Sequence, residues 1–188
     1  MPRAIKPKKL PIFEVNLKYK VYSRTRVFWD FHNDIPPLET IARPLSPDWK
    51  KRVEEEIEIF NIWRKFNESL PLRNLEPVDN RRFSIEININ DVFNEELGWR
   101  KVYILIPLNY PFRMPTLGDP SSDYWFIKLL RKWTGNRPFC IPRVIYLWWT
   151  KLKGKAGIAH YMHIFLVFVT IAGRKSTQLD YDQFTLDI

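Results

Sequence analysis

The stretch RRFSIEININDVFNEELGWRKVYILIPL, residues 81–108, contains two segments in which apolar and polar residues alternate. Alternation with period two is typical of a strand that buries one face, and a short connection between two such strands favours an antiparallel pair. We therefore predict two adjacent strands over 81–90 and 99–108. Their buried faces would consist of Phe83, Ile85, Ile87 and Ile89 on the first and Val102, Ile104, Ile106 and Leu108 on the second.

An amphipathic helix is predicted ahead of these strands, over residues 48–66. Its apolar residues recur at intervals of three and four and form one stripe: Trp49, Val53, Ile57, Phe60 and Trp63. Ser46 would cap the free N–H groups, with Pro47 at the first helical position. Packed on the strands, this helix gives an α+β fold in which an antiparallel β-meander lies against helices.

The outer face of this helix begins with three basic residues, Lys50, Lys51 and Arg52. Upstream of it, FEVNLKYKV (13–21) alternates and predicts an extra N-terminal strand with one face in water. Downstream, SLPLRNLEP (69–77) is expected to form a proline-broken loop. SSDYWFIKLLRKW (121–133) is expected to form a short helix, and PRVIYLWW (142–149) a strand or a buried turn.

The run AGIAHYMHIFLVFVTIAG, residues 156–173, is uncharged over 18 positions, the lower limit for crossing a bilayer. It contains two histidines and a tyrosine, and positive charge flanks both ends, which gives no orientation bias. We therefore predict a buried core helix or a helix–strand pair, and a membrane is not expected as a partner.

Length and composition fit one domain of 188 residues, with 1–46 as an extension, 47–173 as the core and 174–188 as a tail. The net charge of +9 favours an acidic partner, and by itself leaves nucleic acid, an anionic membrane and an acidic protein open. The 6 Gly and 15 Pro, with abundant Lys, Arg and Glu, lean towards a thermophile. A single cysteine fits a reducing compartment, so we expect a cytoplasmic protein.

A rigid exit follows the second predicted strand. In LNYPFRMPTL, residues 108–117 and here called the proline element, Tyr110, Pro111 and Phe112 are followed by Pro115. Prolines fix the backbone and remove N–H donors, while the aromatic rings would fill the core below. A proline-stiffened loop without catalytic meaning is one interpretation. The element also resembles the Tyr-Pro-Phe-x-x-Pro sequence after the third meander strand of the ubiquitin-conjugating enzyme (UBC-like) family, in a divergent or prokaryotic-type form.

Two further features agree with this resemblance. Members of the family carry a catalytic cysteine downstream of the element and a tryptophan eight residues later. Here the only cysteine is Cys140, and Trp148 follows eight positions after it. The order of helix, strands, proline element, cysteine, tryptophan and apolar stretch also agrees over roughly 47–173, whereas the first 46 residues have no counterpart.

The segment before Cys140 departs from the family pattern. The His-Pro-Asn motif, whose asparagine steadies the oxyanion when an amine attacks the thioester, is missing. Asn136 is the only amide close by and is the candidate for that role. The segment is also several residues longer than is typical. Positive charge on Arg137 and Arg143 would favour the Cys140 thiolate, and a small buried thiol is the alternative.

The resemblance implies a thioester transferase that needs no cofactor. Cys140 would accept the C-terminus of a ubiquitin-like protein from an activating enzyme and pass it to a lysine. The basic first turn at Lys50, Lys51 and Arg52 matches where the family meets that enzyme. A catalytically inactive UBC-like binding or scaffold module is one alternative. A basic nucleic-acid-binding protein is another, although the basic residues are spread along the chain.

Other chemistry finds no support in the sequence. His160 and His163 could share a helix face, but zinc takes three or four ligands and no further histidine or cysteine is near in sequence. We therefore predict core or interface histidines and no metal site. No glycine-rich phosphate loop, serine nucleophile elbow or metalloprotease helix is found.

Overall fold

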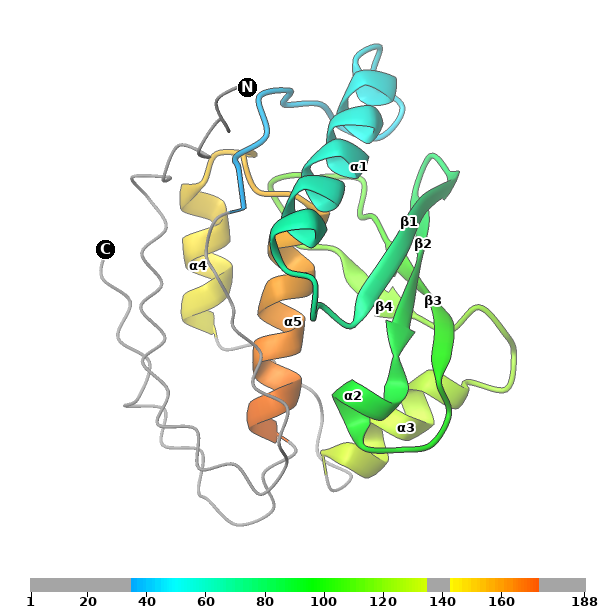
Figure 1. Cartoon of the computed structure of the whole chain (residues 1–188). Helices are drawn as coiled ribbons and strands as arrows, with labels where there is room; N and C mark the ends of the chain where they lie inside the picture. The colour runs from blue at the N-terminus through cyan, green and yellow to red at the C-terminus, as the bar shows by residue number, and fades with distance from the viewer. Residues whose placement is uncertain (1–34, 135–142, 173–188) are drawn as a thin grey trace, which may run out of the picture.

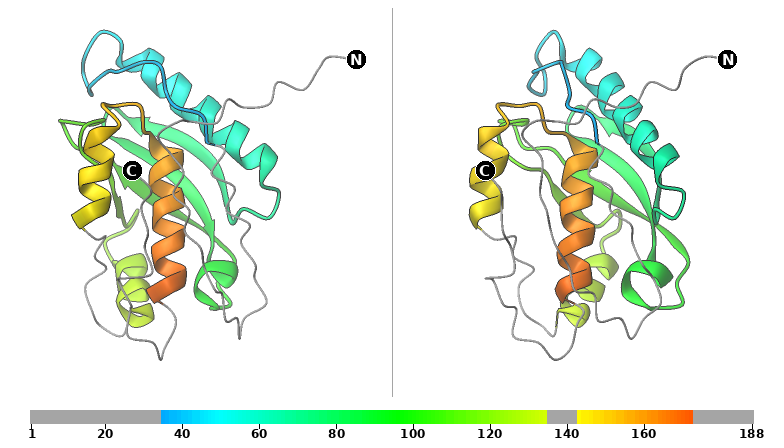
Figure 2. Two further views of the ribbon diagram at one scale, coloured as in Figure 1. Left: turned by 90° about the vertical axis from the view of Figure 1, so that its left-hand side faces the viewer. Right: turned by 60° about the vertical axis from the view of Figure 1, so that its left-hand side comes forward.

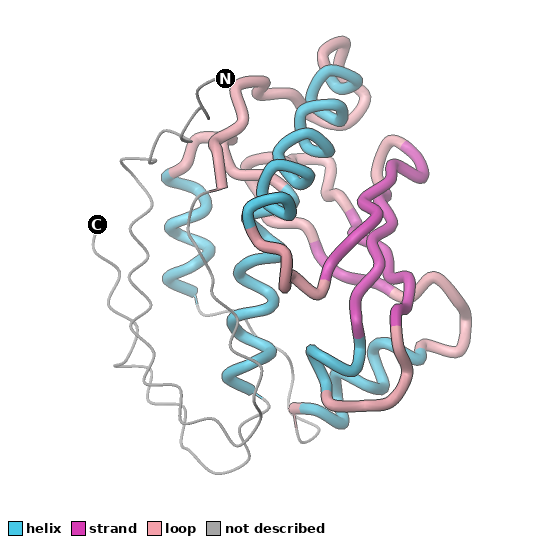
Figure 3. Tube along the Cα trace, viewed as in Figure 1, coloured by secondary structure: helices cyan, strands magenta, loops and turns pink. Residues whose placement is uncertain are grey.

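One antiparallel sheet and several helices make up the described part of the chain. The computed structural model describes residues 35–134 and 143–172. The elements run in the order α1 (Trp49–Phe66), β1 (Leu72–Asp79), β2 (Arg82–Asn88), α2 (Ile89–Phe93), β3 (Trp99–Leu105), β4 (Thr116–Gly118), α3 (Trp125–Trp133), α4 (Arg143–Lys151) and α5 (Ile158–Ala172). The four strands lie in the order β1-β2-β3-β4 (Figure 3). The predicted α+β class with an antiparallel meander is confirmed.

The alternating segments form the centre of this sheet. In the β2–β3 register Phe83 lies opposite Ile104 and Ile85 opposite Val102, and all four side chains are fully buried. The predicted antiparallel pair is confirmed, but both strands are shorter than expected. Ile89 begins α2 instead of ending β2, and Leu108 lies beyond β3 with 58% of its surface exposed.

The first strand of the sheet was not predicted. Residues 69–77 were expected to form a loop, yet β1 runs through them and places Pro77 opposite Phe83. A proline lacks the N–H that a central strand needs on both sides, so it is tolerated only at an edge or a bulge. β1 has both features, because it is an edge strand and its pairing with β2 shifts register twice.

Helices α1 and α5 cover one face of the sheet, and α4 lies beside α5 (Figures 1 and 2). The 18-residue α1 confirms the predicted helix, although its start differs. Ser46 does not cap it: the Ser46 hydroxyl donates to the carbonyl of Arg43 (2.8 Å), and Asp48 is the N-cap residue, without a side-chain cap bond. The chain therefore makes one more turn before the helix begins.

The last two helices resolve the ambiguous part of the sequence. The expected strand or turn over 142–149 is wrong, because α4 occupies Arg143–Lys151. Its buried residues Ile145 and Trp149 are four positions apart, which is a helical spacing that the β-branched and aromatic composition obscured. α5 confirms the predicted core helix. Within the described ranges, no helix is both long enough and apolar enough to cross a membrane.

The predicted short helix over 121–133 is confirmed as α3, which starts at Trp125. The Asp119 carboxylate accepts the backbone N–H groups of Phe126 (2.6 Å) and Ile127 (3.1 Å) and so satisfies its first turn. The predicted N-terminal strand over 13–21 and the tail over 174–188 lie outside the described residues.

Candidate functional site

The proline element leaves the third strand of the meander and turns back under α1. The N–H of Tyr110 donates to the carbonyl of Pro107 and that of Phe112 to Asn109, both at 3.0 Å. The Tyr110–Pro111 peptide bond is cis. The ring of Tyr110 is fully buried and meets the ring of Trp49 edge to face, 6.0 Å between centroids. The element is thereby fixed against the first turn of α1.

A buried ion pair lies directly beneath this contact. Nε of Arg52 donates to Oε1 of Glu56 (2.8 Å), and neither side chain is more than 1% exposed. The Tyr110 hydroxyl donates to the same carboxylate oxygen, and Nη2 of Arg52 donates to the Tyr110 hydroxyl at 3.4 Å. Three polar side chains from α1 and the proline element therefore satisfy one another inside the core.

The rest of the guanidinium binds backbone carbonyls from distant segments. Nη1 of Arg52 donates to the carbonyls of Thr40 (2.6 Å) and Gly154 (2.8 Å), and Nη2 donates to that of Ala156 (2.7 Å). The second oxygen of Glu56 accepts the N–H of Ile158 at the start of α5 (2.7 Å). We call Arg52, Glu56 and Tyr110 the buried clamp, since they join the chain before α1, the proline element and the α4–α5 turn.

Two side chains of the clamp, Arg52 and Tyr110, have shifted pKa values. Burial works to lower the pKa of Arg52, but the interactions with Tyr110 and Glu56 outweigh it and the pKa is raised. Burial raises the pKa of Tyr110 well above its ordinary value, and the neighbouring Glu56 charge adds to this. Arg52 thus stays charged and Tyr110 stays protonated at neutral pH. The clamp is suited to holding geometry and not to transferring protons.

The outer side of the proline element is held by the last helices. The indole N–H of Trp149 in α4 donates to the carbonyl of Pro111 (2.7 Å). A side chain at Gly154 would meet Ile41 and Pro111 at 3.0 Å, so these segments are in close contact. The Arg43 guanidinium lies over the ring of Phe112, 5.6 Å from its centroid. The element is therefore supported from both α1 and the α4–α5 turn.

The structure agrees with the predicted positions of some site residues and contradicts those of others. Lys50 and Lys51 are exposed on the first turn of α1, as expected. Arg52 is not on that outer face, because its guanidinium is buried in the clamp; this part of the prediction is wrong.

Tyr110 fills the core as predicted, and Pro111 is buried too. Phe112 does not fill the core as expected, because it is 39% exposed at the surface. Trp148 belongs to α4, but its side chain lies outside what is described. Cys140 and Asn136 lie outside the described residues.

Sequence reasoning missed Glu56, and it placed Arg52 on the wrong face. The spacing in the sequence allows either assignment. Positions 49, 52, 56, 60 and 63 are three or four residues apart and share one helix face, and the apolar set that includes Val53 and Ile57 has the same spacing. Val53 and Ile57 are only partly buried, whereas Arg52 and Glu56 are at most 1% exposed. Hydrophobicity alone assigns such a pair to the solvent side.

The two histidines are core residues, as predicted. His160 and His163 are 2% and 6% exposed on α5. Nδ1 of His160 accepts the N–H of Gly157 (3.0 Å), and the His163 ring meets that of Trp63 edge to face. Burial lowers the pKa of His160 to about 3, helped by the nearby His163 and Arg52, and lowers the pKa of His163 to about 4. Both imidazoles are neutral at physiological pH.

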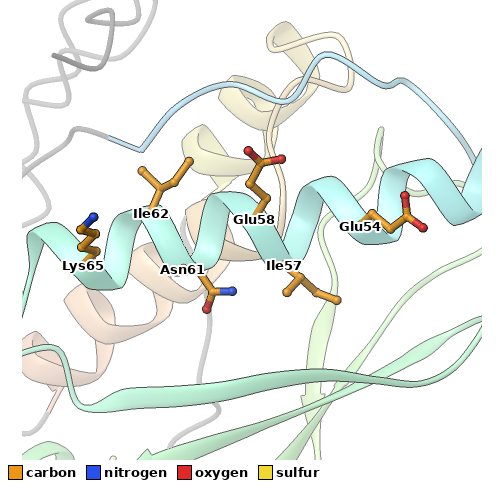
Figure 4. A pocket seen from close by; sticks show the side chains of 6 residues that line it. All are labelled: Glu54, Ile57, Glu58, Asn61, Ile62 and Lys65. Atoms are coloured by element: carbon orange, nitrogen blue, oxygen red, sulfur yellow. The ribbon is translucent and has the colours of Figure 1, made fainter. Parts of the chain in front are cut away.

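A surface hollow of about 460 Å³ lies along the outer side of α1. It is lined by Glu54, Ile57, Glu58, Asn61, Ile62 and Lys65, and Figure 4 shows these side chains splayed to both sides of the helix. Among the described residues one helix supplies the whole lining, so no second element of that part of the chain faces Glu54 and Glu58 to orient a substrate. Among residues 35–134 and 143–172, no three His, Cys, Asp or Glu side chains are grouped to hold a metal ion.

No protein-family model matches this sequence, and no curated protein matches it either. The UBC-like resemblance therefore remains a prediction that depends on the residues quoted above.

We predict that Arg52→Ala and Glu56→Ala each lower the free energy of unfolding by about 3–5 kcal/mol, because each leaves a buried charge without its partner. Lys51→Ala, one residue away but exposed, should change it by less than about 0.5 kcal/mol. Urea unfolding at pH 7 measures all three. Equal effects of Arg52→Ala and Lys51→Ala would show that the clamp does not hold the fold.

We also predict that acid destabilises the fold through the histidines. In the unfolded chain both histidines take up a proton near their ordinary pKa of 6.5. In the folded chain the pKa is about 4 for His163 and about 3 for His160. Their stabilising contribution is therefore complete above pH 6.5 and is lost as the pH falls below it. Each histidine should account for roughly 2 kcal/mol of lost stability between pH 7 and 5.

Urea unfolding of the wild type and of His163→Gln across this pH range provides the measurement. The variant should show about half of the pH-dependent loss, whatever its stability at pH 7. An unchanged slope would mean that His163 does not titrate with unfolding.

Proposed function

We propose that this protein is a UBC-like carrier of a ubiquitin-like protein. Cys140 would receive the modifier's C-terminus as a thioester and pass it to a lysine. The observation that supports this most strongly is the position of the proline element. It follows the third strand of a meander, precedes the segment with the single cysteine, and is braced by the buried clamp against α1.

The brace fits the demands of acyl transfer. The reacting groups must be held in a fixed geometry for the reaction to be fast. The chain runs from the proline element through β4 and α3 towards Cys140, so a rigid element gives the cysteine segment a fixed starting point. In the first step the Cys140 thiolate attacks the thioester that joins the modifier to the activating enzyme, and the thiolate of that enzyme leaves. In the second step the lysine amine attacks the acyl carbon, an amide forms and the thiolate leaves.

The exposed first turn of α1 supplies a docking surface in this proposal. Lys50 and Lys51 project there, so an activating enzyme would meet them with an acidic surface. Arg52 takes no part in such contact, because it is buried.

A second candidate is a non-enzymatic binding module on the same scaffold. It is favoured by the missing His-Pro-Asn motif, which leaves Asn136 as the only amide near Cys140. This version keeps the clamp and the meander and binds the modifier without covalent chemistry.

The carrier proposal predicts an ATP-dependent adduct on Cys140. The tagged full chain is incubated with ATP and an extract of its source organism, and products are separated with and without reductant. The wild type should gain a protein-sized adduct that reductant removes, and Cys140→Ala should gain none. Cys140→Ser should hold an ester that resists reductant, because an oxygen ester does not exchange with thiols.

A second stage of this experiment tests the role of Asn136 separately from that of Cys140. Asn136→Ala should still be charged but should discharge to free lysine about 100-fold more slowly, since it loses an oxyanion donor. If the wild type forms no adduct although iodoacetamide labels native Cys140 quickly, the carrier proposal is refuted. If Cys140 resists labelling and the modifier co-purifies without a covalent link, the binding module replaces it.

A further inference from the structure

Basic side chains from separate parts of the sequence come together at one end of the molecule. In Figure 1 the start of α1, the tip of the β1–β2 hairpin and the α4–α5 turn all lie at the upper end. A bond from Arg52 to Gly154 joins α1 to the α4–α5 turn. A bond from Arg81 to the carbonyl of Ile106 (3.1 Å) joins the hairpin to the residue that follows β3. We call the following exposed residues the basic end: Arg43, Lys50, Lys51, Arg81, Arg113, Lys151, Lys153 and Lys155.

Within residues 35–134 and 143–172, none of the side chains of the basic end forms an ion pair. Acidic residues of the same end are fewer than the cations: Glu39, Asp48, Glu54, Glu55 and Asp79. Of these, Asp79 is paired with Arg82. Further acidic residues gather around α2 and α3 at the opposite end: Asp91, Glu95, Glu96, Asp119 and Asp123. Cations outnumber acidic residues at the basic end, and this excess of positive charge suits a polyanion.

Exposed apolar groups lie among these cations. Ile41, Leu45 and Leu108 are 49%, 68% and 58% exposed. The Arg43 guanidinium lies over the ring of Phe112, 5.6 Å from its centroid, beside the close contact of Ile41 and Pro111 with Gly154. Unpaired bases stack on aromatic rings and on guanidinium planes, whereas the bases of a duplex are already stacked.

We propose that the basic end binds single-stranded nucleic acid. The lysines of the α4–α5 turn and of α1 contact phosphates, and Arg43 with Phe112 receives a base. The sequence argument against nucleic acid was that basic residues are spread along the chain, and the fold removes that objection by collecting them. This activity does not depend on Cys140, although Lys50 and Lys51 also belong to the docking surface of the thioester proposal.

The test is a fluorescence-anisotropy titration of the full chain against a labelled oligothymidylate of about 20 nucleotides, at salt concentrations from about 50 to 200 mM. Binding should weaken steeply with salt. Lys153→Glu with Lys155→Glu should weaken it by at least about tenfold and reduce the slope of log K against log salt by about 1.4, for two phosphate contacts. Phe112→Ala should weaken binding at all salt concentrations and leave the slope unchanged.

A matched control variant distinguishes the loss of contacts at the basic end from a general effect of lowering the net charge of the protein. Lys128→Glu with Arg131→Glu makes the same charge change on exposed residues of α3, at the opposite end. This double variant should lose less than about threefold in affinity, because it removes long-range attraction and no phosphate contact. Equal losses in the two double variants would overturn the proposal.

Two competing ligands complete the design. A duplex of the same length that binds more tightly than the single strand would overturn the role of unpaired bases. Vesicles of anionic phospholipid that capture the chain while the oligonucleotide does not would assign the basic end to a lipid surface instead. An unchanged result with Cys140→Ala is expected, which keeps this test separate from the thioester experiment.

Discussion

The buried pairing of Arg52 with Glu56 is the constraint on which the arrangement of the loops depends. Removing two charges from water costs several kcal/mol per ion unless every polar atom is satisfied. Here the partners are the carbonyls of Thr40, Gly154 and Ala156, the N–H of Ile158 and the hydroxyl of Tyr110. Moving any one of these segments would leave a buried charge incompletely solvated. The pair therefore fixes the positions of these loop segments relative to α1 and to one another.

Both proposed activities depend on that arrangement. The clamp fixes Tyr110 and with it the proline element, which precedes the cysteine segment in the sequence. The same guanidinium holds the α4–α5 turn against α1, which brings Lys153 and Lys155 to the side of Lys50 and Lys51. The two proposed activities thus share one internal support, and both also use Lys50 and Lys51 on the first turn of α1.

Sequence patterns were reliable where burial follows a regular repeat. The α1 helix and the β2–β3 pair have strong periodicity, and both were predicted within a few residues. β1 was missed because Pro77 is tolerated at an edge position that no local pattern reveals. α4 was missed because its aromatic and β-branched residues favour strands, while tertiary contacts of Ile145 and Trp149 select a helix.

By itself the sequence determined the α+β class, the central strand pair, the amphipathic helix and the rigidity of the proline element, because each depends on local periodicity or on the proline ring. Only the tertiary structure decided that Arg52 faces inward and that Phe112 faces outward. It also decided that lysines a hundred positions apart share one surface. Those outcomes depend on which partners lie across the core, and a linear pattern of hydrophobicity carries no record of such partners.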